Sequence, residues 1–176
     1  GLTIALGRAY RLLCAVEGEA YAASILVQRM EEGWLHPAPI WDSVETFDGR
    51  PWRGKVDVIT SGFPCQPFCV AGQRRGLADE RWIWPDIARI LGEVRPRYIF
   101  LENVPAITTS GLAPVISDLA KLRYDAEWDV FSAAEAGAPQ LRRRLFILAV
   151  DTQRGRSNGR SVVANSCDSA VERWEQ

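Results

Sequence analysis

Hydrophobic and polar positions alternate with two different periods along the chain, and this predicts strands and helices in turn. Apolar positions fall on one side of a helix in three segments, residues 19–32, 82–94 and 112–122. Short apolar or alternating runs predict strands over residues 11–17, 56–60, 97–101, 124–132 and 145–150. Strand and helix follow each other in order, so we predict an α/β fold with a doubly wound, mostly parallel sheet.

The segments between these elements refine the prediction. The stretch 33–54 is rich in Pro, Gly and Trp and is predicted to be mainly loop. The strand over 97–101 is apolar throughout its centre, which is typical of a strand covered on both faces. Too little helix separates the last two strands for a parallel crossover. Residues 151–176 are polar without sustained periodicity and are predicted to form a linker or tail.

Composition and charge exclude several classes of protein. The 176 residues are 47% hydrophobic with a net charge of -1, which suits one globular domain and gives no basic signature of nucleic-acid binding. No apolar run approaches the roughly 18 residues of a membrane span, and the first residues do not resemble a signal peptide. The single histidine, His36, and four cysteines without paired CxxC spacing predict no metal site and reduced thiols in the cytoplasm.

One loop carries the strongest candidate chemistry. The strand over 56–60 runs directly into Ser-Gly-Phe-Pro-Cys-Gln-Pro-Phe-Cys-Val-Ala-Gly at 61–72. Pro64 restricts its own backbone and that of Phe63, so Cys65 is presented on a stiffened chain. A cysteine becomes a nucleophile when its surroundings favour the thiolate. From these residues alone, an isolated loop cysteine would more often be inert.

Two carboxylates are predicted to share the edge of the sheet with Cys65. Glu17 ends the first strand, and Glu102 follows the apolar strand over 97–101. Carboxyl ends of parallel strands are where α/β proteins bind ligands, and a carboxyl group beside a buried strand is costly unless it has a partner or a role. Glu17 alone could equally be a charge at a helix N-terminus. The three groups together predict a site.

The motifs resemble those of the cytosine carbon-5 DNA methyltransferase family. Gly-Phe-Pro-Cys-Gln-Pro-Phe at 62–68 resembles the catalytic loop of the family, Glu102-Asn103-Val104 matches its Glu-Asn-Val motif, and Gln140, Arg142 and Arg144 fit its Gln-x-Arg-x-Arg pattern. Cys69 stands where the family usually has Ser, and Gly18 where it often has a bulky residue that packs on adenine.

The resemblance implies a fold and a set of roles. The fold is that of S-adenosylmethionine-dependent methyltransferases. The implied catalytic residues are Cys65, Glu102, Arg142 and Arg144. S-adenosylmethionine is the implied cosubstrate, without a metal, and it would be bound by Gly1, Glu17, Asp42 and Pro64. A flipped cytosine in double-stranded DNA is the implied substrate, contacted by Gln66, Cys69, Asn103, Gln140, Arg74 and Arg75. No protein partner is implied, and we expect a monomer.

The resemblance is incomplete at both ends. Gly1 resembles the last glycine of the cofactor loop with which the family begins, and the family has a target-recognition domain after the strand over 145–150. We therefore expect a piece of a longer methyltransferase, with a catalytic domain at 1–150 and a polar linker or the start of a recognition region at 151–176.

Three other functions remain open from the sequence. A tRNA cytosine-5 methyltransferase uses the same motifs, and a catalytically inactive nucleic-acid-binding homologue is a second possibility. A nucleotide-binding oxidoreductase is disfavoured because no complete G-x-G-x-x-G follows the first strand.

Overall fold

The computed structural model describes residues 10–64, 82–109 and 111–154. Within these ranges the strands form two sheets. The smaller sheet pairs β1 (Ala15–Val16) in parallel with β2 (Ile40–Trp41). The larger has the order β3-β4-β6-β5, with bounds Val58–Ser61, Tyr98–Asn103, Arg143–Asp151 and Tyr124–Ser132. The α/β class is as predicted, and the sheet is mixed.

The direction of the strands follows from the connections. β3 and β4 are parallel because helix α3 (Trp84–Val94) lies between them in sequence and crosses back over the sheet. β6 is antiparallel to both β4 and β5. The prediction that too little helix separates the last two strands for a parallel crossover is thus confirmed, since residues 133–142 make only a turn between them.

Each helix begins and ends where local chemistry dictates. In α2 (Ala20–Glu31), the Glu19 side chain caps the first turn by accepting hydrogen bonds from the backbone of Tyr21 and Ala22. α3 has Pro85 in its first turn, where a missing N–H costs nothing, and it ends at Arg95 in the left-handed conformation, with φ 56°. α4 (Leu112–Lys121) places Leu112, Val115 and Leu119 on its buried side.

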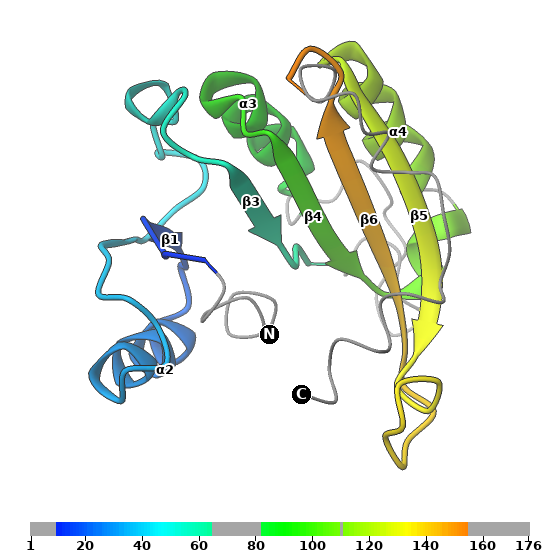
Figure 1. The fold of residues 1–176 in the computed structure, drawn as a ribbon, viewed down its shortest axis with the longest axis horizontal. Helices are drawn as coiled ribbons and strands as arrows, with labels where there is room; N and C mark the ends of the chain where they lie inside the picture. Colours follow the sequence, from blue (N-terminus) through cyan, green and yellow to red (C-terminus); the bar gives the residue numbers. More distant parts are fainter. Residues whose placement is uncertain (1–9, 65–81, 110, 155–176) are drawn as a thin grey trace.

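α3 and α4 cover one face of the larger sheet (Figure 1). The main core lies there, where Ile99, Leu101 and Leu145 are fully buried. The opposite face is only partly covered. On it Phe100 stacks on Phe146 with ring centroids 5.6 Å apart. The apolar run at 97–101 predicted a strand covered on both faces; instead β4 alternates between buried and half-buried residues.

The smaller sheet and α2 lie beside the larger sheet (Figure 1). Its strands differ most from prediction: the strand expected over 11–17 is limited to β1, and β2 lies in a stretch predicted to be mainly loop. A second apolar cluster, Phe47, Ile90 and Val94, joins this region to α3, with Val16 and Ile59 packed against it. In the described part of the chain, no helix is both long and apolar enough to cross a bilayer.

Candidate active site

The carboxyl ends of β3 and β4 and the beginning of β6 meet at one edge of the larger sheet. β3 ends at Ser61, and residues 62–64 continue from it toward Cys65. Glu102 is the penultimate residue of β4, and Arg144 is the second residue of β6. Because β6 runs antiparallel to β4, its first residues arrive at the edge where β4 ends. This edge is the candidate active site.

Glu102 and Arg144 form an ion pair at this edge, with Arg144 Nε 2.7 Å from Glu102 Oε1. The register explains the contact. Glu102 is paired with Phe146, so Arg144 lies two residues away on the same face, within reach across the diagonal. Both side chains keep about a quarter of their surface exposed, 28% and 27%. The structure thus brings together two of the predicted catalytic residues, and both remain accessible to a ligand.

Gly62 allows the Glu102 carboxylate to lie against the strand that leads to Cys65. A Cβ atom at position 62 would lie only 3.2 Å from Glu102 Oε2. A larger residue at position 62 would press on the Glu102 carboxylate. No local signal identifies this contact in the sequence, because the two residues are forty positions apart.

Asn103 ties the end of β4 to the same segment. It is 4% exposed, its Nδ2 donates a hydrogen bond to the Phe63 carbonyl at 3.1 Å, and its Oδ1 accepts one from the Val104 backbone at 2.9 Å. Both contacts fix the backbone from which Pro64 and Cys65 continue. The substrate contact predicted for Asn103 stays a prediction.

Phe63 packs against two tryptophans that come later in the chain. Its ring lies 5.9 Å from that of Trp82 and 5.6 Å from that of Trp84. The Trp84 indole donates to Asp118 Oδ2 at 3.1 Å, and hydrogen bonds from Lys121 and Trp84 hold the pKa of Asp118 below its usual value. Pro64, a predicted cofactor contact, is exposed. Residues 65–81 lie outside the described residues. They include the predicted site residues Cys65, Gln66, Cys69, Arg74 and Arg75.

Gln140 and Arg142 lie in the turn between β5 and β6, and both are exposed. The backbone carbonyl of Arg142 accepts a hydrogen bond from Ala133 at 2.8 Å, which closes the turn. Arg142 comes two residues before Arg144 in the chain, immediately ahead of β6. Their predicted catalytic and substrate roles stay predictions.

Two further carboxylates lie at the ends of the smaller sheet. Val16 pairs with Trp41, so Glu17 and Asp42 each follow the last pair of the parallel ladder. Glu17 Oε1 accepts a hydrogen bond from the Glu19 backbone at 2.9 Å, ahead of α2. Gly18 permits the close approach of the two strand ends, since a Cβ there would lie 2.8 Å from the Asp42 carbonyl oxygen.

These two strand ends fit the cofactor that the resemblance implies. Carboxylates accept hydrogen bonds, and an adenosyl group offers ribose hydroxyls and an adenine amino group as donors. The ends of β1 and β2 lie close together at Gly18, so the Glu17 and Asp42 carboxylates are two acceptors on neighbouring strands. Gly1, the third predicted contact, lies outside the described residues. Among the described residues, no group of three or more His, Cys, Asp or Glu side chains gathers as a metal site would require.

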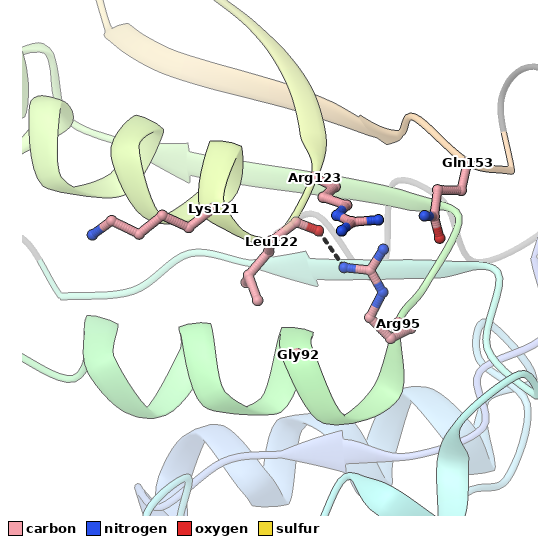
Figure 2. Close-up of a pocket in the computed structure, with 6 residues that line it drawn as sticks. All are labelled: Gly92, Arg95, Lys121, Leu122, Arg123 and Gln153. Atoms are coloured by element: carbon pink, nitrogen blue, oxygen red, sulfur yellow. Dashed lines mark hydrogen bonds between the residues drawn. The ribbon is translucent and has the colours of Figure 1, made fainter.

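A surface pocket lies at the other edge of the larger sheet, away from Glu102. Figure 2 shows it lined by residues at the ends of α3 and α4, at the start of β5 and after β6: Gly92, Arg95, Lys121, Leu122, Arg123 and Gln153. Arg95 donates to the Leu122 carbonyl and pairs with Asp151 at 2.9 Å. Cations here complement the C-terminal ends of two helices. We therefore assign this pocket a structural role.

Tyr124, beside this pocket, gives a prediction for stability at high pH. It is 4% exposed and donates to the Pro96 carbonyl at 2.7 Å. Burial raises the pKa of Tyr124 to about 12 from an ordinary value of 10.0. Because the folded state holds the phenol proton more tightly, this stability is complete below pH 10 and is lost as the pH rises toward 12.

We expect Tyr124→Phe to lower the free energy of unfolding at pH 7 by about 1 kcal/mol, through the lost hydrogen bond. Between pH 10 and 12 the variant should lose less stability than the parent protein, by on the order of 2 kcal/mol. Urea unfolding across this range measures both effects. Parallel pH profiles for the two proteins would contradict the prediction.

Comparison with known proteins places the chain in a family. Residues 1–170 match the family model "C-5 cytosine-specific DNA methylase". The chain is 32% identical over 159 residues to the type II methyltransferase M.PspPI of Psychrobacter sp. (strain TA137), which covers 86% of this chain and 37% of that protein. The chain thus spans well under half the length of this relative.

Solved structures show the same fold. The S. pombe Dnmt2 methyltransferase superposes with a TM-score of 0.66 at 24% identity, over 85% of this chain and 47% of that one. The Entamoeba histolytica methyltransferase EhMeth superposes with a TM-score of 0.64 at 17% identity, over 79% of this chain and 44% of that one. At these identities the likeness concerns the fold, an incomplete Rossmann-like methyltransferase fold. By its family match over residues 1–170, the chain belongs to the C-5 cytosine-specific DNA methylase family.

Proposed function

We propose that the chain carries the catalytic centre of a DNA (cytosine-5-)-methyltransferase. The observation that supports this most directly is the Glu102–Arg144 ion pair at 2.7 Å, at the sheet edge from which the chain continues to Cys65. The family match supports the reaction and the type II relatives support DNA as the substrate. We further propose a bacterial or phage-type cytoplasmic protein that acts as a monomer.

In the proposed mechanism the Cys65 thiolate forms a bond from its sulfur to carbon 6 of the cytosine ring. The electron pair of the 5,6 double bond moves into the ring, toward carbon 5 and nitrogen 3. Glu102, once it has taken up a proton and left its ion pair with Arg144, would hold or protonate nitrogen 3 and relieve this charge. Arg144 would then bind the exocyclic oxygen, and Arg142 a nearby phosphate or carboxylate.

When bound, S-adenosylmethionine would supply an electrophilic methyl group: carbon 5 would take the methyl while the bond from the sulfonium sulfur to that carbon breaks and leaves S-adenosylhomocysteine. A base would then remove the carbon 5 proton, the electron pair would reform the 5,6 double bond, the carbon–sulfur bond would break to release the Cys65 thiolate, and nitrogen 3 would return its proton to Glu102. This chemistry is impossible on a stacked base, so the cytosine must leave the helix. Gln66, Cys69, Asn103, Gln140, Arg74 and Arg75 are the proposed contacts to the flipped nucleotide and its backbone.

Glu17 and Asp42 are proposed to bind the ribose and adenine groups of S-adenosylmethionine, with Gly1 and Pro64 as further contacts. The parallel pairing of β1 and β2 supports the first two, because it presents both carboxylates on adjacent strand ends. Gly18 leaves no side chain to pack on the adenine at that position.

We propose that residues 1–150 form the catalytic domain and that residues 151–176 are a linker or the start of a recognition region. The chain covers 37% of M.PspPI, so it spans only part of the machinery that such relatives contain. We expect turnover by the 176 residues alone to be weak or absent. Normal turnover by these residues would contradict that expectation.

Covalent trapping tests the proposed function. The protein encoded by the complete reading frame is incubated with S-adenosylmethionine and a mixed-sequence duplex containing 5-fluorocytosine. The mixture is then run on a denaturing gel. Fluorine cannot leave carbon 5 as a cation, so the enzyme stays attached, and we expect a shifted band. A band with tRNA alone would replace DNA with RNA as the substrate. No band with either, in a protein that binds S-adenosylmethionine, would indicate an inactive homologue.

A further inference from the structure

The segment between β2 and η1 (Arg50–Trp52) is held by one arginine of α3. Arg89 Nη1 donates to the Phe47 carbonyl at 2.8 Å. Its Nη2 donates to the carbonyls of Val44 at 2.7 Å and Glu45 at 3.2 Å. A planar guanidinium can donate several hydrogen bonds in a fixed geometry, which a lysine cannot reproduce. Arg89 therefore fixes three carbonyls of a segment more than forty residues away.

Glu93, one turn further along α3, holds the same segment, and we call Arg89 and Glu93 together the clamp. Its carboxylate oxygens both lie 3.2 Å from Arg89 Nη1, and Oε2 accepts a hydrogen bond from the Gly49 backbone at 2.8 Å. The approach is close: a Cβ at Gly49 would lie 2.9 Å from Val94 Cγ2 and 3.0 Å from Glu93 Cβ. The Arg89 and Glu93 side chains are 35% and 22% exposed. Both side chains of the clamp thus bind backbone groups of residues 44–49, Arg89 the carbonyls and Glu93 an N–H, and both are partly shielded from water.

The clamp joins the two halves of the proposed site. Among the described strands, no backbone ladder links the smaller sheet to the larger one. α3 packs on the larger sheet, whose edge carries Glu102. Val44, which Arg89 holds, lies two residues after Asp42, the residue that follows β2. Contacts with α3 therefore help to set the position of Asp42 relative to the catalytic edge: the clamp, and the apolar cluster of Phe47, Ile90 and Val94, against which Val16 and Ile59 also pack.

We propose that Arg89, supported by Glu93, is a positioning residue for the cofactor site: it fixes the position of Asp42 relative to the catalytic edge without touching the cofactor itself. This inference rests on the proposed function, because it takes Asp42 as a cofactor contact. The apolar cluster remains when the guanidinium is removed, so the segment stays attached to α3 while its backbone loses a fixed register. The clamp therefore affects affinity for the cofactor more than folding or chemistry.

Arg89→Met tests the inference, since Met keeps an unbranched apolar stem and removes every charged hydrogen bond. In the complete reading frame we expect the dissociation constant for S-adenosylmethionine to rise about tenfold or more. At saturating S-adenosylmethionine, the rate of adduct formation with 5-fluorocytosine DNA should stay within about twofold of the parent protein. Arg89→Lys should bind the cofactor with intermediate affinity, because it keeps the charge and loses the fork.

Arg50→Met is the matched control. Arg50 belongs to the same region of the chain, but its side chain is 76% exposed and pairs with its neighbour Asp48 at 2.8 Å. Its cofactor affinity should equal that of the parent protein. Equal affinity in the parent and Arg89→Met would overturn the inference, as would an equal loss in Arg50→Met. A loss of affinity that disappears when binding is corrected for the unfolded fraction, measured by circular dichroism, would also overturn it. Failure of the parent itself to bind S-adenosylmethionine would instead refute the proposed function.

Discussion

Cys65→Ser is expected to abolish both methyl transfer and covalent trapping, with a fall in turnover of about 10,000-fold or more. A serine hydroxyl has a far higher pKa than a thiol, and without a dedicated base it does not attack carbon 6. The variant should keep its affinity for S-adenosylmethionine, because the substitution replaces a single sulfur atom with oxygen. Transfer of a labelled methyl group to DNA and the denaturing gel measure the two losses.

Cys69→Ser is the matched control for this experiment. It makes the same chemical change four residues further along the chain, and it introduces the residue that the family usually has there. Its turnover and trapping should be close to those of the parent protein. If Cys69→Ser removes the adduct and Cys65→Ser keeps it, the nucleophile has been assigned to the wrong cysteine.

Glu102→Gln is expected to lower turnover by about 100- to 1,000-fold. Glutamine has nearly the same shape as glutamate but cannot transfer a proton to ring nitrogen 3, and it loses the ion pair with Arg144. The loss should appear in the rate of methyl transfer at saturating DNA and S-adenosylmethionine. Because the pair is about a quarter exposed, its loss should lower the free energy of unfolding by only about 1 kcal/mol or less.

Glu127→Gln provides the comparison. Glu127 is an exposed carboxylate of β5, paired in register with Leu148 and remote from the strand ends. Its turnover should match that of the parent. Full activity in Glu102→Gln would remove this residue from the proposed mechanism, and equal losses in both variants would show that charge alone, rather than position, matters.

Much of the larger sheet could be predicted from periodicity. β5 spans Tyr124–Ser132 as predicted, because nine residues of alternation specify a strand strongly. The amphipathic pattern likewise located α4 and the body of α3. The smaller sheet was the weakest prediction. β2 has only two residues, Ile40–Trp41, and follows a proline-rich stretch, so no periodicity could develop.

The candidate site was predicted in its residues but not in its contacts. The motifs named Glu102 and Arg144, yet their ion pair depends on the register between β4 and β6, which no local pattern specifies. Arg89 was not identified at all. Its carbonyl partners lie 42 to 45 residues away, and carbonyl groups leave no trace in a sequence.

Because Arg144 reaches Glu102 diagonally across the β4–β6 pair, the candidate site is more sensitive to a change of chain length within β6 than to one in the turn before it. A deletion of one residue inside β6 would turn Arg144 to the opposite face of the sheet and carry a buried leucine to the outside. The turn at 133–139 extends away from the sheet (Figure 1), and its residues 134–137 are exposed. An inserted tag or reporter at 136–137 would therefore leave the register of β6 intact.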